Sequence, residues 1–277
     1  MTTGTDALRA AIPTLREVGI PDAARDARLL LAYAMGIAPE RLTLHLPEDI
    51  TPEALARFHA AITARTARQP VSQITGQRLF WGRSFRVTPD VLDPRPETEL
   101  LVQTALLAPF TSMLDLGTGS GCILLSCLAD MPDAQGLGTD LSPAALAVAQ
   151  SNAEALHITR ATFAQSDWFQ TIPGTYDLIT SNPPYIAGDE MASLSPEVLH
   201  HEPYMALTPG GDGLDAYRAI ARGAAAHLVP GGRLILEIGP NQSAAVTALL
   251  AAAHMPHAQT LTDLDGRDRV VLVTKPA

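Results

Sequence analysis

The chain has 277 residues, of which 47% are hydrophobic and 17% are charged, and its formal net charge is −10. The length predicts one large domain with a smaller one, and the composition is typical of a soluble globular protein with a substantial core. The acidic charge argues against a protein that grips nucleic acid over a broad surface, because phosphate neutralisation needs clustered lysine and arginine. No apolar run approaches the ~20 residues that span a bilayer, and the N-terminus lacks a secretory pattern. We therefore expect a cytoplasmic protein with no membrane partner.

The cysteine and histidine content excludes several kinds of site. Cys122 and Cys127 are the only cysteines, and we expect both to be buried thiols on one helix rather than a disulfide or a zinc site. The eight histidines lack the spacing of metal ligands. We therefore expect no metal.

Arginine is concentrated between residues 57 and 95, a segment whose only acids are Asp90 and Asp93. This pattern indicates either solvated helix faces or a positive patch that meets an acidic or ribonucleoprotein partner. The residues concerned are Arg57, Arg65, Arg68, Arg78, Arg83, Arg86 and Arg95.

Residues 1–75 are predicted to form a small helical domain. An apolar stripe at helical spacing consists of Ala23, Ala27, Leu30, Leu31 and Ala34. A second helix is predicted after Thr51, which can act as its N-cap, with Pro52 at the first helical position.

Residues 76–98 are rich in aromatic, β-branched and turn-forming residues, which predicts a hairpin connecting the helical domain to a second domain over residues 99–277. In that second domain, strand and helix patterns alternate. The predicted strands are 112–116, 135–140, 161–167, 176–181, 232–239 and 269–275, and the predicted helices are 122–130, 143–156, 213–228 and one from Gln242. This alternation predicts a mostly parallel, doubly wound sheet, on which ligands bind beyond the carboxyl ends of the strands.

A glycine-rich loop follows the first predicted strand of this domain, in the sequence LDLGTGSG. Gly117, Gly119 and Gly121 permit a sharp turn and a close approach to a ligand at the helix N-terminus. Dinucleotide sites space their glycines as G-x-G-x-x-G, whereas this loop reads G-x-G-x-G. The tighter loop favours an uncharged adenosine joined to an amino acid over a pyrophosphate.

Acidic and aromatic residues follow the next two strands. Asp140 is placed to accept hydrogens from both ribose hydroxyls, although it can also be read as a helix N-cap. Asp167 can accept a hydrogen from an adenine amino group, and the indole of Trp168 can pack on the ring, unless Trp168 only fills the core. With the glycine loop, these residues indicate S-adenosylmethionine.

Residues 177–186 read DLITSNPPYI, a strand that ends in a rigid polar turn. The Asn182 side-chain oxygen and the Pro183 carbonyl can accept both hydrogens of a planar NH2 group and hold its nitrogen in line with a methyl–sulfur bond. Pro184 restricts the residue before it and so aims that carbonyl, while Tyr185 offers a flat surface to the target. We predict that Asn182, Pro183 and Tyr185 are catalytic and that all four residues bind substrate, unless the segment is only a proline turn.

The chain resembles the peptide chain release factor glutamine N5-methyltransferases (PrmC/HemK) over most of residues 71–275. The segments that carry the resemblance are ITGQRLFWG, DPRPETE, LDLGTGSG, SDWF, SNPPYI, HEP, LTPGGDGLDAY, GGRLILEIG and DLDGRDRVV. It implies a class I S-adenosylmethionine-dependent methyltransferase fold, α/β in class, with a doubly wound, mostly parallel seven-stranded sheet and a small N-terminal helical bundle joined by a β-hairpin. The implied reaction moves a methyl group from S-adenosylmethionine to the side-chain amide of the glutamine in a release factor's Gly-Gly-Gln loop and leaves S-adenosylhomocysteine.

The resemblance also implies roles for individual residues. Those implied to surround the cofactor are Gly117, Thr118, Gly119, Ser120 and Gly121 at its methionine part, Asp140 at the ribose, Trp168 at the adenine, and Arg95 and Glu97 as a roof. Asn182 would face both the cofactor and the substrate glutamine. The chain departs from the family pattern at His200-His201, before Glu202-Pro203, and at Asp93, and both departures concern the substrate-side loop.

Three other classes of function remain open at this point. An enzyme that methylates amino groups of DNA or RNA bases could also use Asn-Pro-Pro-Tyr, but the acidic charge and the lack of a large basic recognition domain argue against it. A nicotinamide-dependent oxidoreductase is disfavoured by the glycine spacing, and a non-catalytic cofactor-binding protein would have no use for residues 182–185. We expect a monomer, because no exposed coiled-coil seam is visible, and no stable binding of nucleic acid.

Overall fold

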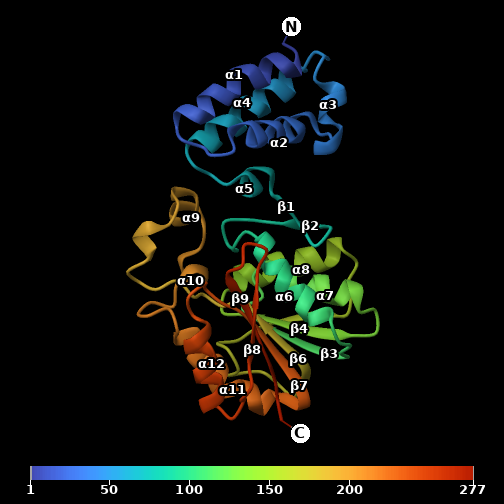
Figure 1. The fold of residues 1–277 in the computed structure, drawn as a ribbon. Helices are drawn as coiled ribbons and strands as arrows, with labels where there is room; N and C mark the ends of the chain where they lie inside the picture. Colours follow the sequence, from blue (N-terminus) through green and yellow to red (C-terminus); the bar gives the residue numbers. More distant parts are fainter. Residues whose placement is uncertain (1, 277) are drawn as a thin grey trace. The chain divides into compact units, whose positions relative to one another are not determined.

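The computed structural model describes residues 2–276 and divides them into two compact units (Figure 1). Unit 1 comprises residues 2–77 together with 195–201, and unit 2 comprises residues 78–194 and 202–276. Across these described residues, every helix is too short or too polar to cross a bilayer.

Unit 1 is a bundle of helices. They are α1 (Gly4–Glu17), α2 (Ala23–Met35), the 3-10 helix η1 (Pro39–Arg41), α3 (Leu42–His45), α4 (Pro52–Thr66), α5 (Val71–Thr75) and α9 (Pro196–His201). The predicted apolar stripe of α2 is buried against α1 and α4. The predicted N-cap is confirmed, because the Thr51 hydroxyl accepts the Ala54 N–H at 3.2 Å and Pro52 occupies the first turn.

Helix α9 belongs to unit 1 although it is remote in sequence, a relationship that local sequence patterns do not predict. The guanidinium of Arg65 lies 2.7 Å from Asp26 and 3.1 Å from Glu197, and Arg68 lies 3.2 Å from the same Glu197 carboxylate. Gln73 Nε2 donates to the carbonyl of His201 at 2.6 Å. Ion pairs and a hydrogen bond therefore tie α9 to the N-terminal helices.

Unit 2 begins with the hairpin β1 (Gln77–Phe80) and β2 (Arg83–Arg86), of which Gln77 is assigned to unit 1, and contains a seven-stranded sheet. The strands of that sheet, in spatial order, are β5 (Ala161–Gln165), β4 (Gln135–Asp140), β3 (Ser112–Leu116), β6 (Tyr176–Ser181), β7 (Leu228–Glu237), β9 (Asp268–Thr274) and β8 (Gln259–Thr262). The first five run parallel, and β9 is antiparallel to both β7 and β8. The predicted mostly parallel, doubly wound sheet is confirmed.

Helices cover both faces of this sheet (Figure 1). The helices of unit 2 are η2 (Pro96–Thr98), α6 (Glu99–Leu106), α7 (Cys122–Asp130), α8 (Pro143–Ala155), η3 (Met191–Ser193), α10 (Tyr204–Leu207), α11 (Asp215–His227) and α12 (Ser243–Ala252). Side chains alternate between the faces along each strand, so Met113 packs in the core with α6 and α7, whereas the adjacent Leu114 packs with α11 and α12. Both faces are therefore closed, and the carboxyl edge is left for ligands.

The arginine-rich segment forms contacts within the protein rather than a simple patch. In unit 2, Arg83 lies 2.5 Å from Asp130, and Arg78 lies 3.6 Å from Asp93. In unit 1, Arg57 donates to the Ala34 carbonyl at 2.6 Å. These side chains contribute to the fold, and the ion pairs of Arg83 and Arg78 offset part of the positive charge of the segment.

Candidate active site

The glycine-rich loop joins β3 to α7, and its shape requires glycine. Gly117, Gly119 and Gly121 have φ angles of 66°, 55° and 78°, a region that residues with a Cβ rarely adopt. The Thr118 N–H donates to the Thr139 carbonyl at 2.8 Å, which ties the loop to the end of β4. A Cβ added at Gly117 would have no atom within 4 Å, so the backbone there borders open space.

A buried carboxylate, that of Asp115, forms a hydrogen bond to this loop. Asp115, in β3, is completely buried and accepts hydrogen bonds of 2.7 Å from the hydroxyls of Thr118 and Thr180. Burial raises the pKa of Asp115 to about 6, against the two hydroxyl hydrogen bonds that lower it. Asp115 therefore links the loop to β6, the strand that carries the Asn-Pro-Pro-Tyr motif.

Asp140, at the end of β4, accepts one backbone hydrogen bond from the glycine loop and one from the start of α8. One oxygen accepts the Gly119 N–H at 3.0 Å, and the other accepts the Ser142 N–H at 2.9 Å. The cap of α8 is Ser142, whose hydroxyl accepts the Ala145 N–H at 3.2 Å, so the alternative of Asp140 as N-cap is wrong. Burial raises the pKa of Asp140, against the hydrogen bonds from Ser142 and Gly119. Each oxygen keeps a lone pair for a further donor.

Asp167 and Trp168 follow β5, as their positions in the sequence predict. Trp168 has a φ of 49° and its carbonyl accepts the Ser166 hydroxyl at 2.8 Å, so the turn is held locally. Asp167 is exposed, and its carboxylate accepts Gln170 Nε2 at 2.8 Å. Trp168 is only partly buried, so it is not simple core filler.

The Asn-Pro-Pro-Tyr segment leaves β6 beside the glycine loop. Ser181, the last residue of β6, pairs with Leu236 of β7, and its hydroxyl donates to the Leu116 carbonyl at 2.7 Å. Asn182 Nδ2 donates to the Thr98 hydroxyl at 3.3 Å. The carbonyl of Tyr185 accepts Gln242 Nε2 at 2.8 Å, which anchors the far end of the motif to the start of α12.

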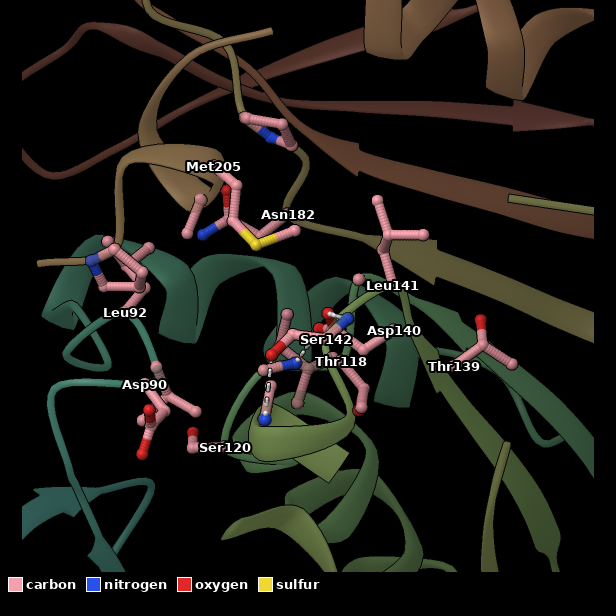
Figure 2. Close-up of a pocket in the computed structure, with 18 of the residues that line it drawn as sticks. Asp90, Leu92, Thr118, Ser120, Thr139, Asp140, Leu141, Ser142, Asn182 and Met205 are labelled. Carbon is pink, nitrogen blue, oxygen red and sulfur yellow. Dashed lines mark hydrogen bonds between the residues drawn. The ribbon is translucent and has the colours of Figure 1, made fainter. Parts of the chain in front are cut away.

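A cavity of about 520 Å³ opens over these strand ends, a size typical of small-molecule sites. Figure 2 shows Asn182 and Met205 on its upper side, with Thr118, Ser120 and Asp140 below them. Predicted site residues that line it are Arg95, Gly117, Thr118, Gly119, Ser120, Asp140, Asp167, Trp168, Asn182 and Pro184.

Four predicted residues lie elsewhere. Gly121 caps α7, and Glu97 is exposed on η2. Pro183 is buried, and the ring of Tyr185 packs partly against the core on the α11 and α12 side. Burial raises the pKa of Tyr185 to about 12, so its hydroxyl stays neutral. Within residues 2–276, these four are absent from the cavity lining.

Several residues that the sequence did not single out also line the cavity. Leu141, Tyr204 and Met205 do so with exposed fractions of 51%, 66% and 46%. Arg95 is held by the buried Glu202, whose carboxylate lies 2.5 Å from the guanidinium. The signal for Glu202 was the acid directly before Pro203 in the HEP segment, but the pairing with Arg95 depends on folding.

The glycine loop and the amide-bearing motif lie at adjacent strand ends around one cavity, an arrangement that defines a class I methyltransferase. In agreement, residues 6–76 match the family described as PrmC N-terminal domain, and residues 90–214 match the methyltransferase small domain. A methyltransferase from Pyrococcus furiosus has a similar fold, with a TM-score of 0.57 at 16% identity over 78% of this chain and 100% of that one.

Similarity in sequence is more specific. The chain is 64% identical over 273 residues to a release factor glutamine methyltransferase from Cereibacter sphaeroides, covering 98% of each chain. It is 43% identical over 267 residues to one from Rhodospirillum rubrum, covering 95% of this chain and 82% of the relative. The chain belongs to the family of release factor glutamine methyltransferases.

Proposed function

We propose that this protein transfers a methyl group from S-adenosylmethionine to the side-chain amide nitrogen of the glutamine in the Gly-Gly-Gln loop of a peptide chain release factor. The observation that carries the proposal is the position of Asn182, which lines the same cavity as the glycine loop and Asp140. The amide oxygen that would accept the substrate and the residues that would bind the cofactor thus line the same cavity. Family membership supports glutamine in a release factor as the target.

The residues around the cavity fit S-adenosylmethionine. The open space beside Gly117 leaves room for the methionine part, and Asp140 keeps acceptor capacity for the two ribose hydroxyls. Trp168 and the exposed Leu141 offer apolar surface to an adenine, and Asp167 offers an acceptor for its amino group. When bound, S-adenosylmethionine supplies a methyl group on a positively charged sulfur.

The chain's own residues would position the glutamine. An amide nitrogen is a poor nucleophile because its lone pair is delocalised, so the main task of the site is orientation. We propose that Asn182 Oδ1 and the Pro183 carbonyl accept the two amide hydrogens, with Pro184 holding that carbonyl in place. Tyr185 stays a predicted substrate contact, although its ring packs against the core and does not line the cavity. Positioning of this kind can lower a barrier by roughly 7–11 kcal/mol.

The reaction needs no strong base within the site. The glutamine nitrogen forms a bond to the methyl carbon while the carbon–sulfur bond breaks, and the electron pair of that bond remains on sulfur. The methylated nitrogen then releases one hydrogen as a proton to water. The products are N5-methylglutamine and S-adenosylhomocysteine.

The two units would divide the work. We propose that unit 1 recognises the release factor and that unit 2 carries the transfer, with the hairpin of residues 76–98 connecting them. A cytoplasmic location, a monomeric state and the absence of stable nucleic-acid binding stay predictions.

Labelled methyl transfer distinguishes this function from methylation of a nucleic-acid base. Purified protein is incubated with radiolabelled S-adenosylmethionine and, separately, a release factor, DNA or ribosomal RNA. We expect label in the release factor alone. Label in DNA or ribosomal RNA without release factor would support the alternative enzyme class and overturn the proposal.

A further inference from the structure

Two buried residues, Thr98 and Glu237, lie near Asn182 and come from different elements, and Thr98 also lines the cavity. Ser181 pairs with Leu236 on the parallel strands β6 and β7, so the next residues, Asn182 just after β6 and Glu237 at the end of β7, lie at the same level. Thr98, the last residue of η2 and the N-cap position of α6, lies next to both. Both side chains are almost completely buried: Thr98 is 2% exposed and Glu237 is 1% exposed.

These three side chains lie in series. Asn182 Nδ2 donates to Thr98 Oγ1 at 3.3 Å, and the Thr98 side chain lies close enough to the Glu237 carboxyl group to lower its pKa, as a hydrogen-bond donor does. A threonine hydroxyl has one hydrogen to donate, whereas an ionised carboxylate only accepts. When Glu237 is ionised, Thr98 must therefore donate to Glu237 and accept from Asn182.

We propose that Thr98 and Glu237 are positioning residues that set the orientation of the Asn182 amide, so that its oxygen rather than its NH2 group faces the substrate. This inference rests on the proposed function, because it deepens the role of Asn182 in holding an amide. An asparagine side chain has nearly the same shape in both orientations, so packing alone selects weakly between them. In the flipped orientation the NH2 group of Asn182 would face the NH2 group of the substrate, and two donors cannot bond.

The surroundings of Glu237 agree with a functional role. Its Oε2 atom is buried and has no hydrogen-bond partner in the described part of the chain, a costly arrangement of the kind found at functional sites. Burial raises the pKa of Glu237 to about 7, against the hydrogen bond from Thr98 and the charge of Arg269. The titratable and charged groups that act on Glu237 from the neighbouring elements are Arg95, Glu97, Cys122, Tyr185, Tyr217 and Arg269.

Protonation of Glu237 would remove the preference for one orientation of the Asn182 amide. A carboxylic acid can donate its own hydrogen to Thr98, and the Thr98 hydrogen is then free to turn toward Asn182. Thr98 as donor would attract Asn182 Oδ1 and favour the flipped amide. The productive orientation is therefore favoured above the pKa of Glu237 and lost below it.

Substitutions at Thr98 test this arrangement with release factor as the methyl acceptor. Thr98→Val removes the hydroxyl and keeps the shape, and we expect kcat to fall by about 10- to 100-fold, or about 1.4–2.7 kcal/mol in the barrier. Thr98→Ser restores a hydroxyl and should recover kcat to within about threefold of wild type, since the hydrogen-bonding group is the same. The matched control is Thr104→Val, because Thr104 is as buried but donates only to the Leu100 carbonyl of its own helix. Affinity for S-adenosylhomocysteine, measured by calorimetry, should change by less than about threefold in every variant, since none loses a cofactor contact in this proposal.

Glu237→Gln provides an independent readout. A glutamine does not titrate, so the fall of kcat at low pH should disappear in this variant, while wild-type kcat should fall as pH drops through about 7. If Thr98→Val does not fold, this comparison decides alone. A Thr98→Val enzyme with wild-type kcat, or an unchanged acid limb in Glu237→Gln, would overturn the inference. If wild-type protein does not methylate the release factor at all, the proposed function fails instead, so the two failures are distinct.

Discussion

One carboxylate oxygen of Asp140 accepts a hydrogen bond from the backbone N–H of Gly119 at 3.0 Å. The contact joins the end of β4 to the centre of the glycine loop. Because the second oxygen is bonded to the Ser142 N–H, the carboxylate is fixed at both ends and presents its remaining lone pairs to the cavity. A single side chain thus shapes the loop and offers acceptors to a ribose.

Replacing Asp140 should therefore weaken cofactor binding in two ways. Asp140→Ala removes the acceptors for a ribose diol and the support for Gly119, and we expect about 10- to 100-fold weaker binding of S-adenosylhomocysteine, as for the loss of charged hydrogen bonds. Isothermal titration calorimetry measures this affinity. Asp133→Ala, at an exposed acid in the same unit, serves as the control. Equal affinity in the two variants would show that Asp140 does not bind the cofactor.

Much of the fold follows from local patterns. β3, β4 and β6 have the predicted bounds, because turn-forming residues border each of them. β8 (Gln259–Thr262) was not singled out, since it is a short, mostly exposed edge strand without an apolar run. β7 begins at Leu228, four residues before the predicted start, because Leu228 pairs with Tyr176 across an irregular register.

The site was predictable where its residues directly follow, or end, the strands of the parallel sheet. The glycine loop and Asp140 face the cavity because strand ends of a parallel sheet meet at one edge. Thr98 and Glu237 were not predicted as site residues, because their role depends on contacts with Asn182 across 84 residues and on the register of β7. Likewise, nothing local indicates that Glu197 packs with the N-terminal helices.

Glu237 should reduce stability at alkaline pH. Its folded-state pKa is raised from 4.5 to about 7, so its favourable contribution is present below its unfolded pKa and is lost as pH rises through the folded one. Glu237→Gln should therefore unfold with a higher free energy than wild type at about pH 8, by on the order of 1–3 kcal/mol, and the advantage should shrink towards about pH 5. Urea unfolding at both pH values measures it. A variant less stable than wild type at alkaline pH would mean that the ionised carboxylate is well accommodated.

Glu197 should hold α9 to unit 1. Partial burial raises its pKa, but the hydrogen bonds from its own backbone and from Arg68 and Arg65 outweigh this, and the pKa of Glu197 lies below its usual value. The contribution is therefore present at neutral pH and is lost as pH falls below the unfolded value of about 4.5. We expect Glu197→Ala to be cleaved about threefold to tenfold faster in residues 195–201 under limited proteolysis, because local opening becomes easier.

The exposed pair of Arg9 and Asp6 provides the control for Glu197. These side chains are 3.4 Å apart and largely exposed, so the pair contributes little. Arg9→Ala should leave the cleavage rate unchanged. Equal cleavage of Glu197→Ala and wild type would show that the segment is held by other contacts.

The most direct test of glutamine methylation by Asn182 is position-resolved mass spectrometry of a release factor after reaction. Wild-type protein should add one methyl group to the side-chain nitrogen of the glutamine in the Gly-Gly-Gln loop. Asn182→Ala should lower this rate by at least about 100-fold, because Asn182 orients the glutamine amide that accepts the methyl group. Affinity for S-adenosylhomocysteine should stay within about threefold of wild type. Asn241→Ala, at an exposed asparagine, should match wild type. A methyl group on any other residue, or full glutamine methylation by Asn182→Ala, would contradict the proposed role of Asn182.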